Sequence, residues 1–227
     1  MAKPLRTFAL FAAPLLVLSL ACSLVSGPDI DGSEVDPVIE SGLGQGVLFQ
    51  DDFSDTSSGW DQVEAEEGVT NYAHGAYRIF VGQADRDYWA NPGLSFGDVR
   101  VEVDATKVGG PDDNDFGVIC RYQDVDNFYG FLVSSDGYYS ITKVADGVRE
   151  TLGTDGWPAT DAVHQGDASN RIRADCIGDE LSIYANGQLV YSTNDSAFAT
   201  GDVGLIAGTF SETGTDILFD NFVVLRP

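Results

Sequence analysis

The stretch FGVICRYQDVDNFYGF, residues 116–131, decides the fold class of this chain. It contains two runs rich in aromatic and β-branched residues, and a short polar turn separates them. In the first run Phe116, Val118 and Cys120 fall on alternate positions. A β-strand points alternate side chains to the same face, so the stretch predicts two neighbouring strands with one face toward a core.

The same pattern continues on both sides of this stretch. Asp-Gly or Asn-Gly pairs at 136–137, 146–147 and 186–187 accept the positive φ angles of tight hairpin turns. No window has helical periodicity, apart from one short helical turn considered at 195–199. We therefore predict an all-β fold, a two-sheet antiparallel sandwich, which the resemblance given below makes a jelly roll. The expected strands are 77–81, 99–107, 116–123, 128–134, 138–144, 148–152, 171–177, 181–185, 189–191, 203–207 and 217–225.

Several motifs of the chain resemble the concanavalin A-like jelly roll, and more narrowly its laminin-G-like and 3-keto-disaccharide-hydrolase-like branches. The motifs are residues 116–131 with GYYSITK at 137–143, NRIRA at 170–174, LSIYANG at 181–187, GDVGLIAG at 201–208 and FDNFVV at 219–224. The resemblance covers about residues 48–227. It implies the fold more than an activity, because this fold hosts lectins, hydrolases, adhesion modules and inert spacers.

The charge balance excludes one class of function. The chain has 36 acidic and 12 basic side chains, a formal charge of −24 at pH 7. A nucleic-acid binder neutralises phosphates with clustered Lys and Arg, and this sequence has no such cluster. We therefore expect no nucleic-acid partner.

The first 21 residues have the features of an export signal. Lys3 and Arg6 form a positive end, and the apolar run that follows is short for a membrane span. The run resembles a bacterial lipoprotein signal that is cut before Cys22, although Ser19 and Leu20 depart from the preferred Leu and small residue. We predict cleavage there and lipid attachment to Cys22. Ordinary secretion by cleavage at the same bond and an uncleaved anchor are the alternatives.

A linker follows the predicted cleavage site. Cleavage leaves 10 basic and 36 acidic side chains, a formal charge of −26, so acyl chains and not a basic patch would hold the protein on a membrane. Residues 22–46 are rich in Ser, Gly, Pro and acidic residues, which predicts a flexible acidic linker, with an edge strand at 35–39 as the alternative. The jelly-roll domain is then expected at 47–227.

The cysteine count fits this arrangement. With lipid on Cys22, Cys120 and Cys176 remain as a pair in an oxidising compartment. Each falls on the apolar side of a predicted strand. We predict a disulfide between them. Two buried free thiols are the alternative, because the sequence does not show how close their Cα atoms lie.

The strand at 101–106 tests for glycanase chemistry. Glycanases of the resembled superfamily carry a Glu-x-Asp-x-(x)-Glu strand, and a retaining mechanism needs two carboxyl groups about 5–5.5 Å apart. Here Glu102 and Asp104 alternate, but Thr106 and Lys107 stand where the second Glu belongs. The two histidines lie outside any Gly-x-Ser-x-Gly elbow. We therefore predict no catalytic residue, and a solvated outer face for Glu102 and Asp104.

Loops rich in Asp and Asn raise the question of calcium, which takes six to eight oxygen ligands in irregular geometry. None of these loops has the EF-hand spacing. In jelly rolls of the resembled type the first and last strands pair, which would bring Asp52 near Asp220. Two interpretations stay open: an acidic, solubilising surface of Asx-turns, or a structural calcium ion bound at these two residues.

Aromatic side chains beside polar ones indicate a sugar-binding surface, because sugar rings stack on aromatic rings while polar groups bind the hydroxyls. The predicted ligand-binding residues are Arg121, Asn127, Tyr129, Trp89 and Trp157. By strand alternation Arg121 is expected on the face opposite Cys120, away from the core. The alternative is that these aromatic residues fill the core or the sheet edges.

The sequence therefore predicts an exported, membrane-anchored lipoprotein whose jelly-roll domain binds carbohydrate or mediates adhesion without catalysis. Its expected partners are a glycan or a surface protein, and the membrane through the lipid anchor. The resemblance implies a hydrolase acting on 3-keto-glycosides as an alternative. A structural module that binds another protein is the third hypothesis.

Overall fold

The computed structural model describes residues 46–227, which form two antiparallel β-sheets. The nine-stranded sheet contains β1 (Val47–Asp51), β2 (Val63–Glu64), β3 (Gly68–Ala73), β4 (Ala76–Val81), β6 (Val99–Gly109), β11 (Ser169–Ile177), β12 (Glu180–Ala185), β13 (Gln188–Asn194) and β15 (Thr215–Leu225). The six-stranded sheet contains β5 (Arg86–Ala90), β7 (Asn114–Asp124), β8 (Asn127–Val133), β9 (Tyr139–Ala145), β10 (Val148–Thr151) and β14 (Asp202–Thr209).

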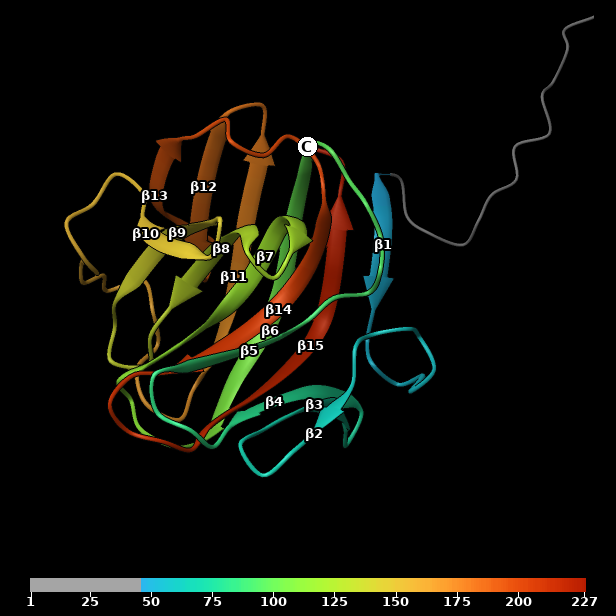
Figure 1. The fold of residues 1–227 in the computed structure, drawn as a ribbon, viewed down its shortest axis with the longest axis vertical. Coiled ribbons are helices and arrows are strands. Elements are labelled where there is room, and N and C mark those ends of the chain that lie inside the picture. Colours follow the sequence, from blue (N-terminus) through green and yellow to red (C-terminus); the bar gives the residue numbers. More distant parts are fainter. Residues whose placement is uncertain (1–45) are drawn as a thin grey trace, which may run out of the picture. The chain divides into compact units, whose positions relative to one another are not determined.

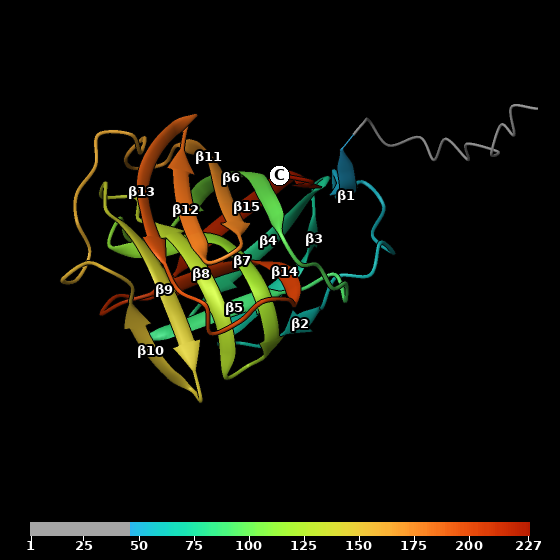
Figure 2. The same cartoon turned by 90° about the horizontal axis from the view of Figure 1, so that it is seen from above.

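The two sheets are separate layers of a jelly-roll sandwich. In Figure 1, β5 and β14 cross in front of β6 and β15, and in Figure 2 the strands β11 and β12 lie above β8 and β9. Residues 46–227 contain no helix, so the helical turn considered at 195–199 is wrong. Every predicted strand is present, with bounds that differ by a few residues. The all-β, two-sheet prediction is confirmed.

Strand order matters for the site described below. The six-stranded sheet runs β10-β9-β8-β7-β14-β5, so strands far apart in the chain become neighbours and β10 and β5 are its two edges. In the nine-stranded sheet β1 pairs with β15, so the first strand lies beside the last, as expected.

The main core lies between the sheets and consists of the inward-facing half of each strand. On β7 the residues Phe116, Val118 and Cys120 point into it and are fully buried, as the alternation predicts. β6 contributes Val101 and Val103 from the facing sheet in the same way. The burial of these alternate apolar side chains fixes which face of each strand is turned inward.

A disulfide joins the two layers. Cys120 of β7 and Cys176 of β11 are bonded, with a Cα–Cα distance of 6.9 Å and a sequence separation of 56. Because β7 and β11 belong to different sheets, the bond crosses the core. The pairing is the one that the sequence favoured over two free thiols.

Two of the hairpin turns follow their predicted chemistry. Asp146 and Gly147, between β9 and β10, have φ angles of 50° and 75°. Asn186 and Gly187, between β12 and β13, have φ angles of 50° and 81°. Positive φ at both central residues matches the twist of the flanking strands, which fixes the register of each hairpin.

The predicted orientation of Arg121 is wrong. The pairing of β7 with β8 shifts register between Cys120 and Asp124, and Arg121 itself has a φ of 53°. This bulge breaks the alternation, because extra residues in one strand turn the following side chains away from their expected face. The Arg121 side chain is buried, and it donates to the Phe198 carbonyl at 2.9 Å and to Asp98 at 3.2 Å.

Predictions for the signal, for Cys22 and for the linker up to residue 45 lie outside the described residues. Within residues 46–227, no helix is long and apolar enough to span a membrane. The first described strand begins at Val47, next to the expected start of the domain.

Candidate functional site

The outer face of the six-stranded sheet carries an apolar cluster of its own. Five buried residues on this face point away from the main core: Ile119, Phe128, Leu132, Val144 and Ile206. Trp89, Tyr122 and Trp157 are half-buried and pack against the cluster. The ring centroids of Trp89 and Tyr122 each lie 5.8 Å from that of Phe128. The outer face therefore offers aromatic rings that are partly open to solvent.

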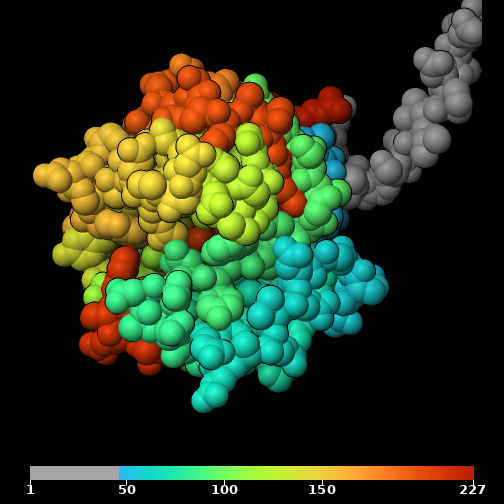
Figure 3. Space-filling view, viewed as in Figure 1, coloured from blue at the N-terminus to red at the C-terminus, as the bar shows by residue number. Residues whose placement is uncertain are grey.

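Trp157 reaches this face from the loop that follows β10. Its ring meets Phe210, which follows β14, at a centroid distance of 5.7 Å in an edge-to-face arrangement. Figure 3 looks onto this side of the sheet, where the yellow atoms around β10 and the green atoms around β5 border a hollow. The segment after β10 thus forms one wall of the outer face.

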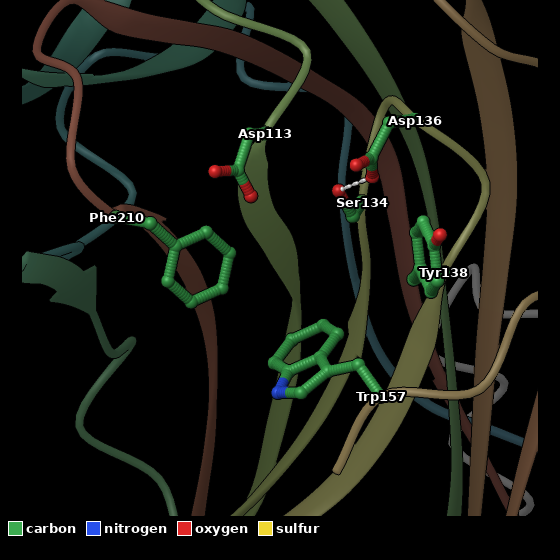
Figure 4. A pocket seen from close by; sticks show the side chains of 6 residues that line it. All are labelled: Asp113, Ser134, Asp136, Tyr138, Trp157 and Phe210. Carbon is green, nitrogen blue, oxygen red and sulfur yellow. Dashed lines mark hydrogen bonds between the residues drawn. The ribbon is translucent and has the colours of Figure 1, made fainter.

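A pocket of about 450 Å³ lies among the loops at one end of the sheet. Figure 4 shows its lining, which consists of Asp113, Ser134, Asp136, Tyr138, Trp157 and Phe210. The Asp113 carboxylate and the rings of Trp157 and Phe210 point into the same space, while the Ser134 hydroxyl donates to Asp136. The lining combines three aromatic rings with two carboxylates, and it contains no Lys or Arg.

A charged cluster lies on the same face, above Gly208 of β14. Gly208 pairs with Asp115 of β7 on one side and with Asp87 of β5 on the other. A Cβ atom on Gly208 would lie 2.1 Å from Asp87 Oδ1 and 2.6 Å from Asp115 Oδ1. The two carboxylate oxygens are therefore at most about 4.7 Å apart, the sum of these distances. The absence of a side chain at Gly208 is what lets the two carboxylates approach each other.

Arg149 of β10 completes the charged cluster. Its guanidinium donates to Asp87 and lies 4.0 Å from Asp115 Oδ2. β10 and β5 are opposite edges of the sheet, so this ion pair bridges the outer face from one edge to the other. The Arg149 side chain is 33% exposed, whereas that of Asp115 is 1% exposed, so the arginine lies toward solvent and the carboxylate beneath it.

Asp115 has an unusual protonation equilibrium. Burial, and after it repulsion by the Asp87 carboxylate, raises the pKa of Asp115 to about 7, against the opposing effect of Arg149. Two close carboxylates disfavour joint ionisation in the same way. Asp115 Oδ1 is buried and has no hydrogen-bond partner among the described residues. The cluster therefore contains a carboxyl group that exchanges its proton near neutral pH.

The structure separates the five predicted ligand-binding residues. Trp89 and Trp157 lie on the outer face of the six-stranded sheet, half-buried. Tyr129 is fully buried in the main core, where its hydroxyl bonds Asp195, so its predicted role as a ligand contact is wrong. Arg121 is buried at the bulge, so its predicted role as a ligand contact is wrong as well.

Asn127 lies at the β7–β8 turn and is occupied by local hydrogen bonds. Its amide nitrogen donates to Asp124 at 2.8 Å, and its amide oxygen accepts from the backbone of Asp146 at 3.2 Å. These bonds tie the β7–β8 turn to the β9–β10 turn. The observed role of Asn127 is thus to hold two hairpin turns together.

Of the predicted calcium ligands, Asp52 directly follows β1, whose last residue pairs with Phe222, and Asp220 lies two residues before Phe222 in the middle of β15. Asp52 accepts hydrogen bonds from Ser54, which hold the pKa of its carboxyl below the usual value, and Asp220 accepts from the backbone of Asn221. Within residues 46–227, no three His, Cys, Asp or Glu side chains are grouped so as to hold a metal ion. A calcium ion at Asp52 and Asp220 stays a prediction.

Glu102 and Asp104 lie in β6 on the outer side of the other sheet. Arg171 forms ion pairs with both, at 3.0 Å to Glu102 and 3.1 Å to Asp104. Their side chains are half-exposed, which agrees with the solvated outer face expected from the sequence. They lie on a different sheet from the charged cluster.

Asp87, Asp115, Arg149 and Phe210 were not among the predicted ligand-binding residues. One signal was available for Asp115, because strand alternation places it on the same face as Ile119 and opposite to Phe116 and Cys120. Nothing local in the sequence pairs it with Asp87 or Arg149. Those contacts depend on strand order.

The fold is the concanavalin A-like jelly roll, as solved structures show. The carbohydrate binding module CBM66 from Bacillus subtilis aligns with a TM-score of 0.61 and 20% identity, over 74% of this chain and 96% of that one. The beta-glucanase of Bacillus licheniformis aligns with a TM-score of 0.55 and 11% identity, over 81% and 100%. The GH43 protein BlXynB from Bacillus licheniformis aligns with a TM-score of 0.57 and 15% identity, over 78% and 39%. No protein-family model and no curated protein matches the sequence.

Proposed function

We propose that this chain is an exported, lipid-anchored protein whose jelly-roll domain binds glycans on the outer face of the six-stranded sheet. The observation that carries the proposal is the pair of half-buried tryptophans, Trp89 and Trp157, on a face that also holds a pocket and a charged cluster. Binding sites for small molecules combine such apolar walls with a few polar groups that converge on the ligand.

The chemistry of the face suits a sugar. A sugar ring has apolar C–H faces that stack on aromatic rings, and Trp157 with Phe210 provides such a wall. Its hydroxyls both donate and accept hydrogen bonds, and the carboxylates and Arg149 supply the complementary groups. Two of the similar structures are described as a carbohydrate binding module and a beta-glucanase, which supports a sugar ligand for this chain.

Replacement of Trp157 with alanine tests this proposal. We expect the affinity for a glycan found by array screening to fall about tenfold or more, because a buried aromatic anchor typically contributes over 1 kcal/mol to binding. The measurement is titration calorimetry on the purified protein. The matched control is Tyr184→Ala. Tyr184 lies in β12 of the nine-stranded sheet, where its ring packs against Arg173. Unchanged affinity in Trp157→Ala, or no binding across a broad array, contradicts the proposal.

The export and lipid anchor rest on the first 22 residues. The disulfide between Cys120 and Cys176 supports export, because such bonds persist in oxidising compartments. We expect the full chain, produced in bacteria with a labelled fatty acid, to carry label and to fractionate with membranes. Cys22→Ala should lose both, while Cys120→Ala keeps the label. Label that persists in Cys22→Ala contradicts lipidation at this residue.

A hydrolase acting on 3-keto-glycosides is the second candidate function. It is favoured by the carboxyl pair Asp87 and Asp115, in which one pKa is raised to about 7 beside a second, close carboxylate. Environments that push two carboxyl pKa values apart are typical of acid–base pairs in catalysis. The Asp115→Asn variant described in the Discussion tests this candidate as well.

A further inference from the structure

We propose that the glycan site prefers amino sugars with a free ammonium group, and that the pocket in Figure 4 holds this group between Asp113, Asp136 and the ring of Trp157. The inference rests on the proposed glycan-binding function and adds the class of sugar to it. Three features of the molecule carry it: the composition of the pocket, the free state of its carboxylates and the charge around it.

The walls of the pocket suit a cation. Tyr138, Trp157 and Phe210 contribute three aromatic rings, and Phe210 meets Trp157 edge to face. Aromatic faces are electron-rich and attract an ammonium group placed over them, most strongly in the case of tryptophan. A neutral sugar would use the same walls for stacking alone.

The two carboxylates of the pocket have no cationic partner within the described part of the chain. Neither Asp113 nor Asp136 forms an ion pair with a Lys, Arg or His there. Asp113 is exposed at the mouth, and in Figure 4 its carboxylate points into the cavity. Asp136 accepts a hydrogen bond from Ser134, which orients it toward the same space. Two carboxylates that lack a counter-ion provide the charge-assisted bonds that an ammonium group makes.

The surroundings strengthen the preference. Asp115 lies two residues after Asp113, near the start of β7, and its Oδ1 atom is buried without a partner among the described residues. The whole chain carries a formal charge of −24, which raises the local concentration of cations near the surface. Acetylation of the amine removes the positive charge of the sugar. A uronic acid carries a negative charge, which the carboxylates of the pocket repel. Both changes should weaken binding.

The test compares two probes that differ only at nitrogen. Titration calorimetry measures the affinity for a glucosamine oligomer and for the N-acetylglucosamine oligomer of equal length, at a pH where the free amines are protonated. We expect the glucosamine oligomer to bind about tenfold more tightly, and we expect added salt to reduce the difference, because salt screens charges that are open to solvent.

Variants of the pocket separate charge from stacking. Asp113→Asn combined with Asp136→Asn should weaken binding of the glucosamine oligomer much more than binding of the acetylated oligomer, and bring the two affinities to within about twofold of each other. Asp179→Asn is the control. It removes one carboxylate charge from the exposed β11–β12 turn, which belongs to the nine-stranded sheet and does not line the pocket.

Equal affinity of the parent protein for the two oligomers overturns the amino-sugar inference and leaves the proposed glycan binding standing. Failure of both oligomers together with a neutral-glycan hit on the array has the same consequence. An array that shows no glycan binding at all overturns the proposed function itself. Binding of lysine-rich peptides in place of either oligomer assigns the pocket to a protein partner and also overturns the inference.

Discussion

Replacement of both Cys120 and Cys176 with alanine is expected to lower the free energy of unfolding by about 4 kcal/mol. The disulfide joins positions that are 56 residues apart in the sequence. Without it the unfolded chain gains the conformational freedom of that loop, and the folded state gains nothing in return. The bond also links β7 to β11 across the core, so its loss removes the only side-chain crosslink of covalent type between the two sheets within residues 46–227.

Urea unfolding of the parent and of the double variant, followed by tryptophan fluorescence, measures this difference. Reductant provides an internal control, because it should destabilise the parent by a similar amount and leave the double variant unchanged. A double variant that unfolds within about 1 kcal/mol of the parent would show that the crosslink contributes little beyond the packing of the two side chains.

Replacement of Asp115 with asparagine is expected to change how stability depends on pH. The pKa of Asp115 is raised to about 7 in the folded protein, whereas an unfolded Asp titrates near about 3.9. The stabilising contribution of the protonated form is therefore complete below about pH 4 and is lost as the pH rises through about 7. Asparagine keeps the neutral shape and has no proton to lose.

The predicted difference between parent and Asp115→Asn is small near pH 4 and reaches about 3–4 kcal/mol in favour of the variant near pH 8. Urea unfolding at several pH values measures it, and Asp113→Asn is the control because that carboxyl is exposed. A difference that stays constant with pH would mean that Asp115 remains ionised in the folded protein throughout.

The same variant distinguishes the two candidate functions. A hydrolase that uses Asp115 as its acid or base loses turnover of a 3-keto-glycoside in Asp115→Asn. A binding protein shows no turnover in either form, and its affinity for glucosamine oligomers changes only modestly. Parent protein that turns over such a substrate would make catalysis the function to pursue.

Much of the fold follows from local patterns that are visible in the sequence. The inward face of the run that contains Phe116, Val118 and Cys120 was predicted correctly, because alternate side chains of a strand point to the same face. The Asp146-Gly147 and Asn186-Gly187 turns were located correctly, because few other residue pairs accept two positive φ angles. The strands that were missed, β3 and β5 among them, are short, with six and five residues. β5 is an edge strand, and β3 is one strand from an edge, where less burial is required.

The errors at Arg121 and Tyr129 have different causes. Arg121 sits in a bulge, where β7 has more residues than the paired part of β8, and nothing in the sequence around it indicates a positive φ at an arginine. Tyr129 keeps strict alternation with Phe131 in β8, and both point into the core. Its hydroxyl donates a hydrogen bond to the half-buried Asp195, so a residue with a polar tip could still be a core residue.

The all-β class, most strand positions and the apolar face of the central strands are predictable from local sequence, because they depend on the period of neighbouring residues. The identity of neighbouring strands in each sheet depends on the folded arrangement of the whole domain. Asp87, Asp115 and Arg149 come from β5, β7 and β10, and Trp157 meets Phe210 across a gap of more than fifty residues. These contacts follow from the strand order and curvature of one sheet. Many strand pairings between residues far apart in the sequence together set this order and this curvature. No local sequence pattern encodes such pairings.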